Sequence, residues 1–222
     1  MIKAVIFDMD GTMFDTERVF ILAWDYAGEK TGIGKAGHMV MKTHGASIRD
    51  SRDIWQREYG NRFHEDEIRK YSKDFITEYY LHHETPIKTG LFELIEYLKN
   101  KRIMLGISTS SPRYEVDIHL RSAGLTDCFH AITDRDMVEN QKPAPDSFTK
   151  TCELLGANPV NCFALEDSKN GILSACSAGC KAIMIPDLWQ PDDDTKKLLY
   201  AQCDTLHDVI RVIEESMESE DV

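Results

Sequence analysis

The chain has 222 residues, and 38 acidic against 26 basic side chains give it a formal net charge of −12 at pH 7. This length allows one large domain or one domain with an insertion, and it can bury a core without disulfide bonds. The acidic excess argues against nucleic acid polymers and anionic membranes as partners, because both attract clusters of Lys and Arg. No apolar stretch is long enough to cross a bilayer, and the six cysteines form no C-x-x-C pair. We therefore expect a cytoplasmic protein with free thiols.

The first predicted element is a buried strand at residues 2–7, which is apolar and rich in β-branched side chains. It runs directly into Asp8-Met9-Asp10-Gly11-Thr12. Two carboxylates two residues apart at a strand end tend to face the same way. At a separation of about 4 Å they repel by roughly 4 kcal/mol at an effective dielectric constant of about 20. Such a pair needs a cation, a proton or a separating bend, and a solvated turn is the alternative interpretation.

The next segment, residues 16–84, lacks a strand pattern and predicts several helices. The helical periodicity covers residues 17–30, 48–59 and 65–80. Pro86 and Gly90 then interrupt it. We expect an all-helical insertion after the first strand.

Strand and helix patterns alternate in the rest of the chain. Apolar runs predict strands at residues 103–109, 131–133, 162–165 and 182–185, and amphipathic segments predict helices at residues 91–100, 114–123, 146–155 and 171–178. This alternation is typical of an α/β fold in which helices cover both faces of a parallel sheet. Ligands bind such sheets beyond the carboxyl ends of the strands.

Two stretches after predicted strands carry groups suited to an anion. Thr109 and Ser110 lie where a strand gives way to a helix, and hydroxyls with backbone N–H groups can hold an oxyanion there. Lys142 lies in a loop stiffened by Pro143 and Pro145, and a fixed ammonium among carboxylates indicates phosphate binding. Helix capping by the hydroxyls and a solvated loop lysine are the alternatives.

A second acidic pair, Glu166-Asp167, follows the predicted strand at 162–165. If this strand neighbours the first one, three or four carboxylates converge at one edge of the sheet. Oxygen ligands of this kind favour a hard cation, with Mg²⁺ preferred. Capping of the next helix by Asp167 and Ser168 is the alternative interpretation, and both can hold.

Together and in this order, these stretches resemble the haloacid dehalogenase superfamily of phosphotransferases. The resemblance rests on D-x-D-G-T at 8–12, a strand-end hydroxyl at Thr109, K-P at 142–143, and E-D-S with G-I-x-x-A-x-x-A-G at 166–179. It implies a Rossmann-like α/β core domain, residues 1–15 and 85–222, with an inserted all-helical cap domain, residues 16–84. The insertion resembles the cap of the subgroup that includes β-phosphoglucomutase and many sugar-phosphate phosphatases.

The resemblance also implies a Mg²⁺-dependent phosphatase acting on a small phosphorylated metabolite, a sugar phosphate or a nucleotide monophosphate. Asp8 would be the nucleophile that forms an aspartyl-phosphate, and Asp10 would be the general acid and base. The implied metal ligands are Asp8, the Asp10 backbone carbonyl, Asp167 and Glu166. The implied phosphate ligands are Thr109, Ser110 and Lys142.

The leaving group would meet the cap, where the candidate residues are Glu17, Phe20, His44 and Arg49. Each of them can equally be ordinary helix surface or cap core. Three other functions compete with the phosphatase: a phosphohexose mutase of the β-phosphoglucomutase type, a true haloacid dehalogenase and a catalytically silent binding module. Mutases that resemble this chain carry a histidine twelve residues after the nucleophile, where this chain has Phe20. We expect the protein to be a monomer.

The negative charge is concentrated at the end of the chain. Residues 187–222 hold 11 acidic and 3 basic side chains and so contribute −8. We expect residues 192–194 to be a surface loop and residues 214–221 to be a solvated acidic tail. Such peripheral charge is screened within about 10 Å at ordinary salt, so it does not exclude an anionic substrate.

Overall fold

The computed structural model describes residues 2–43 and 48–218, and it divides into two compact units. One unit comprises Met1–Phe14 and Ile87–Val222 and is built from strands and helices. The other, Asp15–Pro86, is helical. That the helical unit acts as a cap stays a prediction.

The first unit is built on a parallel sheet with the strand order β3-β2-β1-β4-β5-β6. The strands are β1 (Ala4–Phe7), β2 (Met104–Ser108), β3 (Ala131–Thr133), β4 (Cys162–Glu166), β5 (Lys181–Met184) and β6 (Ala201–Gln202). The central strand, β1, pairs in parallel with β2 on one side and with β4 on the other. The predicted parallel α/β sheet is confirmed, and the two-residue strand β6 is an addition to it.

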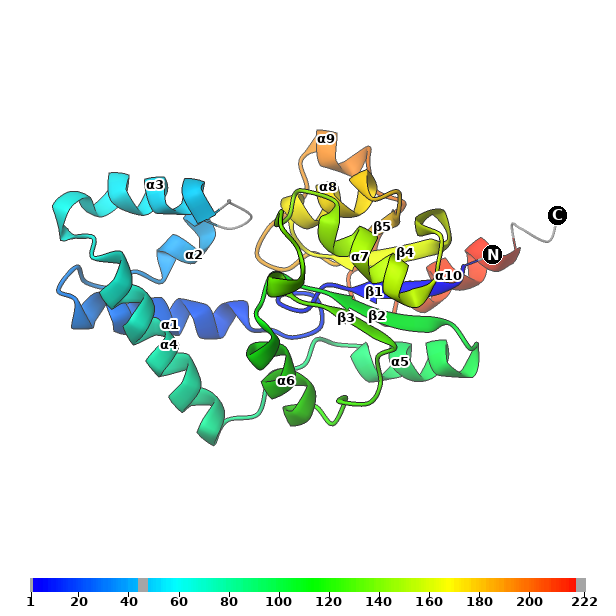
Figure 1. The fold of residues 1–222 in the computed structure, drawn as a ribbon, viewed down its shortest axis with the longest axis horizontal. Coiled ribbons are helices and arrows are strands. Elements are labelled where there is room, and N and C mark those ends of the chain that lie inside the picture. Colours follow the sequence, from blue (N-terminus) through cyan, green and yellow to red (C-terminus); the bar gives the residue numbers. More distant parts are fainter. Residues whose placement is uncertain (1, 44–47, 219–222) are drawn as a thin grey trace. The chain divides into compact units, whose positions relative to one another are not determined.

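Helices cover both faces of this sheet, so its strands are buried on both sides. Alternate side chains of β1 point to opposite faces of the sheet. Val5 and Phe7 belong to one apolar cluster, and Ala4 and Ile6 belong to the other. The first cluster includes side chains of α5 (Leu91–Asn100), α6 (Arg113–Ser122) and α10 (Val209–Glu218), and the second includes side chains of α7 (Asp146–Leu155) and α8 (Lys169–Ser177). Figure 1 shows α7 and α8 on one side of the strands and α5 on the other.

The helical unit consists of α1 (Glu17–Lys30), α2 (His38–Thr43), α3 (Ile48–Tyr59) and α4 (Glu65–His82). Aromatic rings contribute to its core: the ring of the buried Trp55 lies 5.0 Å from that of Trp24 and stacks on Phe63 at 5.3 Å. An ion pair between Arg52 and Glu65 links α3 to α4 on the surface. The short helix α2 was not predicted.

Short one-turn helices complete the connections. They are η1 (Gly60–Arg62), η2 (Arg135–Met137), η3 (Pro159–Asn161) and the four-residue α9 (Asp193–Lys196). Among the described residues, no helix is both long and apolar enough to span a membrane.

Two predictions for the acidic end of the chain are right about exposure and wrong about conformation, because the acidic side chains at 192–194, 214, 215 and 218 are exposed but belong to or cap helices. Residues 192–194 do not form a plain loop, because Asp192 accepts a hydrogen bond from the Thr195 backbone N–H at 2.8 Å and caps α9. The expected tail at 214–221 is helical as far as Glu218, since α10 buries Val212, Ile213 and Ser216. The many charged residues of α10 made it difficult to recognise in the sequence that Val209, Val212 and Ile213 form one apolar face of a helix. Residues 219–221 lie outside the described part of the chain.

Candidate active site

Three buried carboxylates meet at the carboxyl ends of β1 and β4. The two strands are paired with Phe7 opposite Leu165, so Asp8 and Glu166 are the next residues on neighbouring strands. Ligand oxygens of Asp8, Glu166 and Asp167 all lie within 4.8 Å of one another, and the three residues are buried. The pairing of the strands thus brings together the two acidic stretches of the sequence.

Lys142 enters this cluster from the loop before α7. Its Nζ lies 2.6 Å from Asp8 Oδ1 and 2.6 Å from Glu166 Oε1, and it donates to the Ser108 carbonyl oxygen at 3.0 Å. The ammonium also lies 4.9 Å from the centroid of the Phe148 ring. The lysine is therefore fixed between two carboxylates instead of being solvated.

The electrostatics of the cluster follow from its burial. Burial raises the pKa of Asp8 well above its ordinary value, and the nearby Lys142 ammonium opposes that rise. Burial by itself would lower the pKa of Lys142, but the charges of Asp8 and Glu166 raise it above its ordinary value. The cluster thus holds three carboxylates and one ammonium, which pairs with two of them, and a further cation would relieve the excess negative charge.

Glu166 is held beneath the start of α8. Its Oε2 accepts hydrogen bonds from the backbone N–H groups of Asp167 (3.2 Å) and Ser168 (3.1 Å) and from the Ser168 hydroxyl (3.0 Å). Gly171 makes this fit possible, because a Cβ at that position would overlap the Glu166 carboxylate. Since Oε1 accepts from Lys142, both oxygens of Glu166 carry hydrogen bonds that orient the lysine and the loop.

Asp167 is supported by the turn that follows β1. The Thr12 hydroxyl donates to Asp167 Oδ1 at 3.2 Å. Gly11 has φ +82°, and a Cβ there would overlap the Asp167 carboxylate. Glycine is required at this position by both its backbone angle and the close approach of the side chain. Thr12 is a site residue that sequence reasoning did not single out.

The β2–α6 loop brings hydroxyls to the same edge of the sheet. Thr109 is buried, and its Oγ1 accepts from the Ser111 backbone N–H at 3.0 Å. Ser110 is exposed. The Ser111 hydroxyl donates to Asp10 Oδ2 at 2.6 Å. Ser110, its neighbour, was predicted as a phosphate ligand, and Ser111 was not predicted as a site residue. A run of three hydroxyl residues was the only signal for Ser111 in the sequence, and it did not say which one reaches Asp10.

The candidate specificity residues belong to the helical unit. Glu17 is the first residue of α1, and Phe20 lies one turn further along it. His44 lies outside the described residues, and so does the side chain of Arg49. Their proposed contact with a leaving group stays a prediction.

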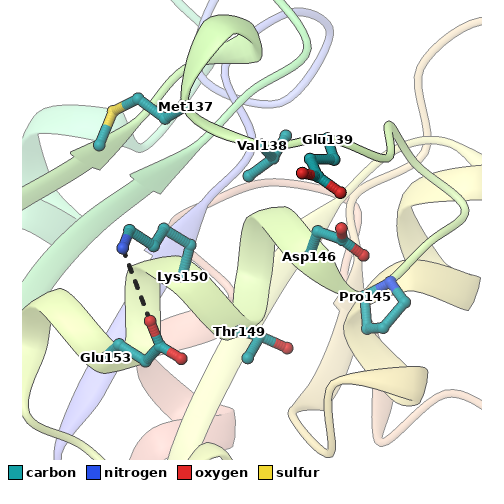
Figure 2. A pocket seen from close by; sticks show the side chains of 8 residues that line it. All are labelled: Met137, Val138, Glu139, Pro145, Asp146, Thr149, Lys150 and Glu153. Carbon is teal, nitrogen blue, oxygen red and sulfur yellow. Dashed lines mark ion pairs between the residues drawn. The ribbon is translucent and has the colours of Figure 1, made fainter.

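A hollow of about 370 Å³ lies on the first unit, between the segment from Met137 to Glu139 and helix α7. Figure 2 shows the side chains around it, among which Lys150 and Glu153 form an ion pair at 3.7 Å. None of the eight residues that line it is a predicted site residue. We therefore locate the candidate site at the buried carboxylates, on chemical grounds, and not in this hollow.

Comparison with known proteins identifies the family. The model of the haloacid dehalogenase-like hydrolases matches residues 5–185. Phosphorylated carbohydrates phosphatase of Thermotoga maritima is 32% identical over 190 residues, which cover 82% of this chain and 83% of that protein. β-Phosphoglucomutase of Bacillus subtilis is 32% identical over 189 residues, which cover 82% of each protein.

Solved structures agree with this assignment. A β-phosphoglucomutase from Clostridium difficile superposes with a TM-score of 0.78 at 27% identity and covers 99% of both chains. The part of the sequence that matches the family model includes Asp8, Lys142 and Asp167. The chain belongs to the haloacid dehalogenase-like hydrolase family.

Proposed function

We propose that this protein is a Mg²⁺-dependent phosphatase that hydrolyses a small phosphomonoester, a sugar phosphate or a nucleotide monophosphate, through an aspartyl-phosphate on Asp8. The observation that carries the proposal is the buried ammonium of Lys142, 2.6 Å from both Asp8 and Glu166. A fixed cation beside a carboxylate nucleophile suits an incoming phosphate. The relative named as a phosphatase of phosphorylated carbohydrates supports the choice of substrate class.

The donor set fits a magnesium ion. Asp8, Glu166 and Asp167 offer hard oxygen ligands within 4.8 Å of one another, and their negative charge exceeds that of the one lysine. We propose that Asp8, Asp167 and the backbone carbonyl of Asp10 bind the ion, with Glu166 in or beside its ligand shell. When bound, the ion neutralises charge and so lets an anionic carboxylate approach an anionic phosphate.

The first half of the reaction transfers the phosphoryl group to the protein. A carboxylate oxygen of Asp8 attacks phosphorus, and the bond from phosphorus to the ester oxygen breaks. Asp10 donates a proton to the departing oxygen, which leaves as an alcohol. Lys142, Thr109 and Ser110 hold the other phosphate oxygens and stabilise charge in the transition state.

The second half releases phosphate. A water molecule attacks the phosphorus of the aspartyl-phosphate while Asp10, now ionised, takes one of its protons. The bond between phosphorus and the Asp8 oxygen breaks, and Asp8 returns as a carboxylate. Inorganic phosphate leaves, and Asp10 is again protonated for the next cycle.

A mutase of the β-phosphoglucomutase type is the second candidate, because a protein of that name is as similar to the chain as the phosphatase. The two activities share the first step and differ in whether water or a sugar hydroxyl receives the phosphoryl group. Phe20 stands where the mutases that resemble this chain carry a histidine. We therefore favour transfer to water.

We propose further that the unit Asp15–Pro86 reads the leaving group as a cap, with Glu17, Phe20, His44 and Arg49 as the residues to test. Closure of such a cap would exclude bulk water from the reaction. The enzyme is proposed to act as a cytoplasmic monomer.

The test is phosphate release from a panel of hexose phosphates and nucleoside monophosphates. We expect release with Mg²⁺, loss of release in EDTA, and loss in Asp8→Asn. Release that persists in EDTA or in the variant contradicts the mechanism. Conversion of β-glucose 1-phosphate to the 6-phosphate without release of phosphate would identify the mutase instead.

A further inference from the structure

Both backbone polar groups of Ser111 are hydrogen-bonded. Its N–H donates to Thr109 Oγ1 at 3.0 Å, and its carbonyl oxygen accepts from the Arg135 N–H at 3.1 Å. These two hydrogen bonds fix the backbone of the loop between β2 and α6 and therefore the position of the Ser111 Cα atom. The hydroxyl then donates to Asp10 Oδ2 at 2.6 Å.

Helix capping does not explain this hydroxyl. The N-cap position of α6 is Pro112, one residue later, and α6 has no side-chain cap. A serine just before a helix commonly satisfies the N–H groups of the first turn. Here the Ser111 hydroxyl reaches instead to a carboxylate 101 residues away in the sequence.

A second carboxyl group, that of Glu115, neighbours Ser111. Glu115 is half-buried on the first turn of α6, and the Tyr114 hydroxyl donates to its Oε1 at 2.7 Å. Burial raises the pKa of Glu115, and the charge of Asp10 acts in the same direction. Ser111 thus neighbours two carboxyl groups, and its hydroxyl donates to Asp10 Oδ2 at 2.6 Å.

We propose that Ser111 is a positioning residue that orients the Asp10 carboxyl group for proton transfer to the leaving group; the inference rests on the proposed phosphatase function. Rotation about the last bond of an aspartate side chain has broad minima, whereas proton transfer needs one carboxyl oxygen near the ester oxygen. The hydrogen bond to Oδ2 favours one orientation of the carboxyl group before the substrate arrives. Ser111 therefore acts through Asp10.

The dependence on the leaving group tests this role. An alkyl phosphate needs a proton on its departing oxygen, whereas p-nitrophenolate leaves without one. We expect Ser111→Ala to lower kcat/KM by about 10- to 100-fold for an alkyl phosphate that the enzyme accepts, part of the 10²- to 10⁴-fold that general acid catalysis supplies. For p-nitrophenyl phosphate we expect a loss of less than about 3-fold, since little protonation is required. Ser111→Thr, which keeps the hydroxyl, should retain most of the activity on both substrates.

A double-mutant cycle tests whether Ser111 works through Asp10. In the Asp10→Asn background, Ser111→Ala should cause no further loss on the alkyl phosphate. Ser177→Ala, at an exposed position late in α8, is the matched control and should leave both rates unchanged. Thermal unfolding of each variant checks that the fold is intact.

Two results would overturn the proposal. An equal loss on both substrates would mean that Ser111 binds the phosphate or supports the fold, and no loss on either would mean that Asp10 is oriented without it. Asp8→Asn separates this outcome from a failure of the proposed function: if that variant stays active, the phosphatase mechanism is wrong whatever Ser111 does.

Discussion

At the scale of single residues, the site depends on one lysine shared by two buried acids. Lys142→Met keeps much of the side-chain volume and removes the ammonium that lies between Asp8 and Glu166. Removing one partner of a buried ion pair costs about 3–5 kcal/mol, because the other charges stay buried without compensation. We expect that loss in urea unfolding, together with loss of phosphatase activity. A variant as stable as the wild type would contradict the arrangement described for Lys142.

At Gly171 we predict that a substitution favourable to helix formation lowers activity. Alanine is better than glycine inside a helix by about 1 kcal/mol. At this position its Cβ would overlap the Glu166 carboxylate, and Glu166 in turn holds Lys142. We expect Gly171→Ala to reduce kcat/KM, measured by phosphate release, while Ser177→Ala in the same helix does not. Wild-type activity in Gly171→Ala would show that Glu166 need not stay beneath α8.

Sequence reasoning at this scale identified residues by their type and place in a motif. Asp8, Lys142 and Asp167 could be named because carboxylates at strand ends and a lysine followed by two prolines are visible in the sequence. Ser111 could not be distinguished from Ser110, because the direction of a loop side chain depends on contacts with distant residues such as Arg135.

At the scale of elements, the C-terminal end of the described chain departed from its predicted conformation. The helix α10 is charged over its last turn, yet Ile213 is fully buried against the sheet. Ile213→Ala should cost about 2–5 kcal/mol in urea unfolding, the usual range for removing a buried isoleucine side chain. Glu215→Ala, which removes an exposed ion pair with Arg211, should change stability by less than about 1 kcal/mol. Equal effects of the two substitutions would mean that α10 is not docked.

Other elements followed from their patterns because their apolar spacing was regular. The bounds predicted for α1, α5 and α7 agree with the structure. The elements α2, α9 and β6 are six, four and two residues long, too short for periodicity to reveal. Their formation depends on contacts within the folded unit and not on local sequence.

At the scale of the whole molecule, stability should depend on pH through a buried histidine. Burial lowers the pKa of His119, which packs against the Phe14 ring at 5.5 Å. The folded protein therefore binds a proton here less readily than the unfolded chain does. The resulting stability is present above about pH 6.5, the ordinary histidine pKa, and is lost as pH falls toward the lower pKa of the folded state. All other titratable groups are present in both the wild type and a His119 variant, so the difference between their pH profiles of stability reports on His119.

The difference between wild type and His119→Asn isolates this effect. We expect urea unfolding to show a larger loss of stability between pH 8 and pH 5, working values on either side of about 6.5, in the wild type than in the variant. Parallel pH profiles would mean that His119 is protonated as readily in the folded protein as in the unfolded one.

In the proposed mechanism, the whole protein turns over through a phosphoryl group bound to Asp8. The most direct measurement uses Asp10→Asn, which can accept the group from p-nitrophenyl phosphate but lacks the base that releases it. The variant is incubated with p-nitrophenyl phosphate and Mg²⁺ and quenched with acid. Peptide mass spectrometry should then find a phosphoryl group on Asp8, and it should find none in the double variant that also carries Asp8→Asn. A label on another residue, or no label while the wild type still hydrolyses the ester, would contradict the proposal.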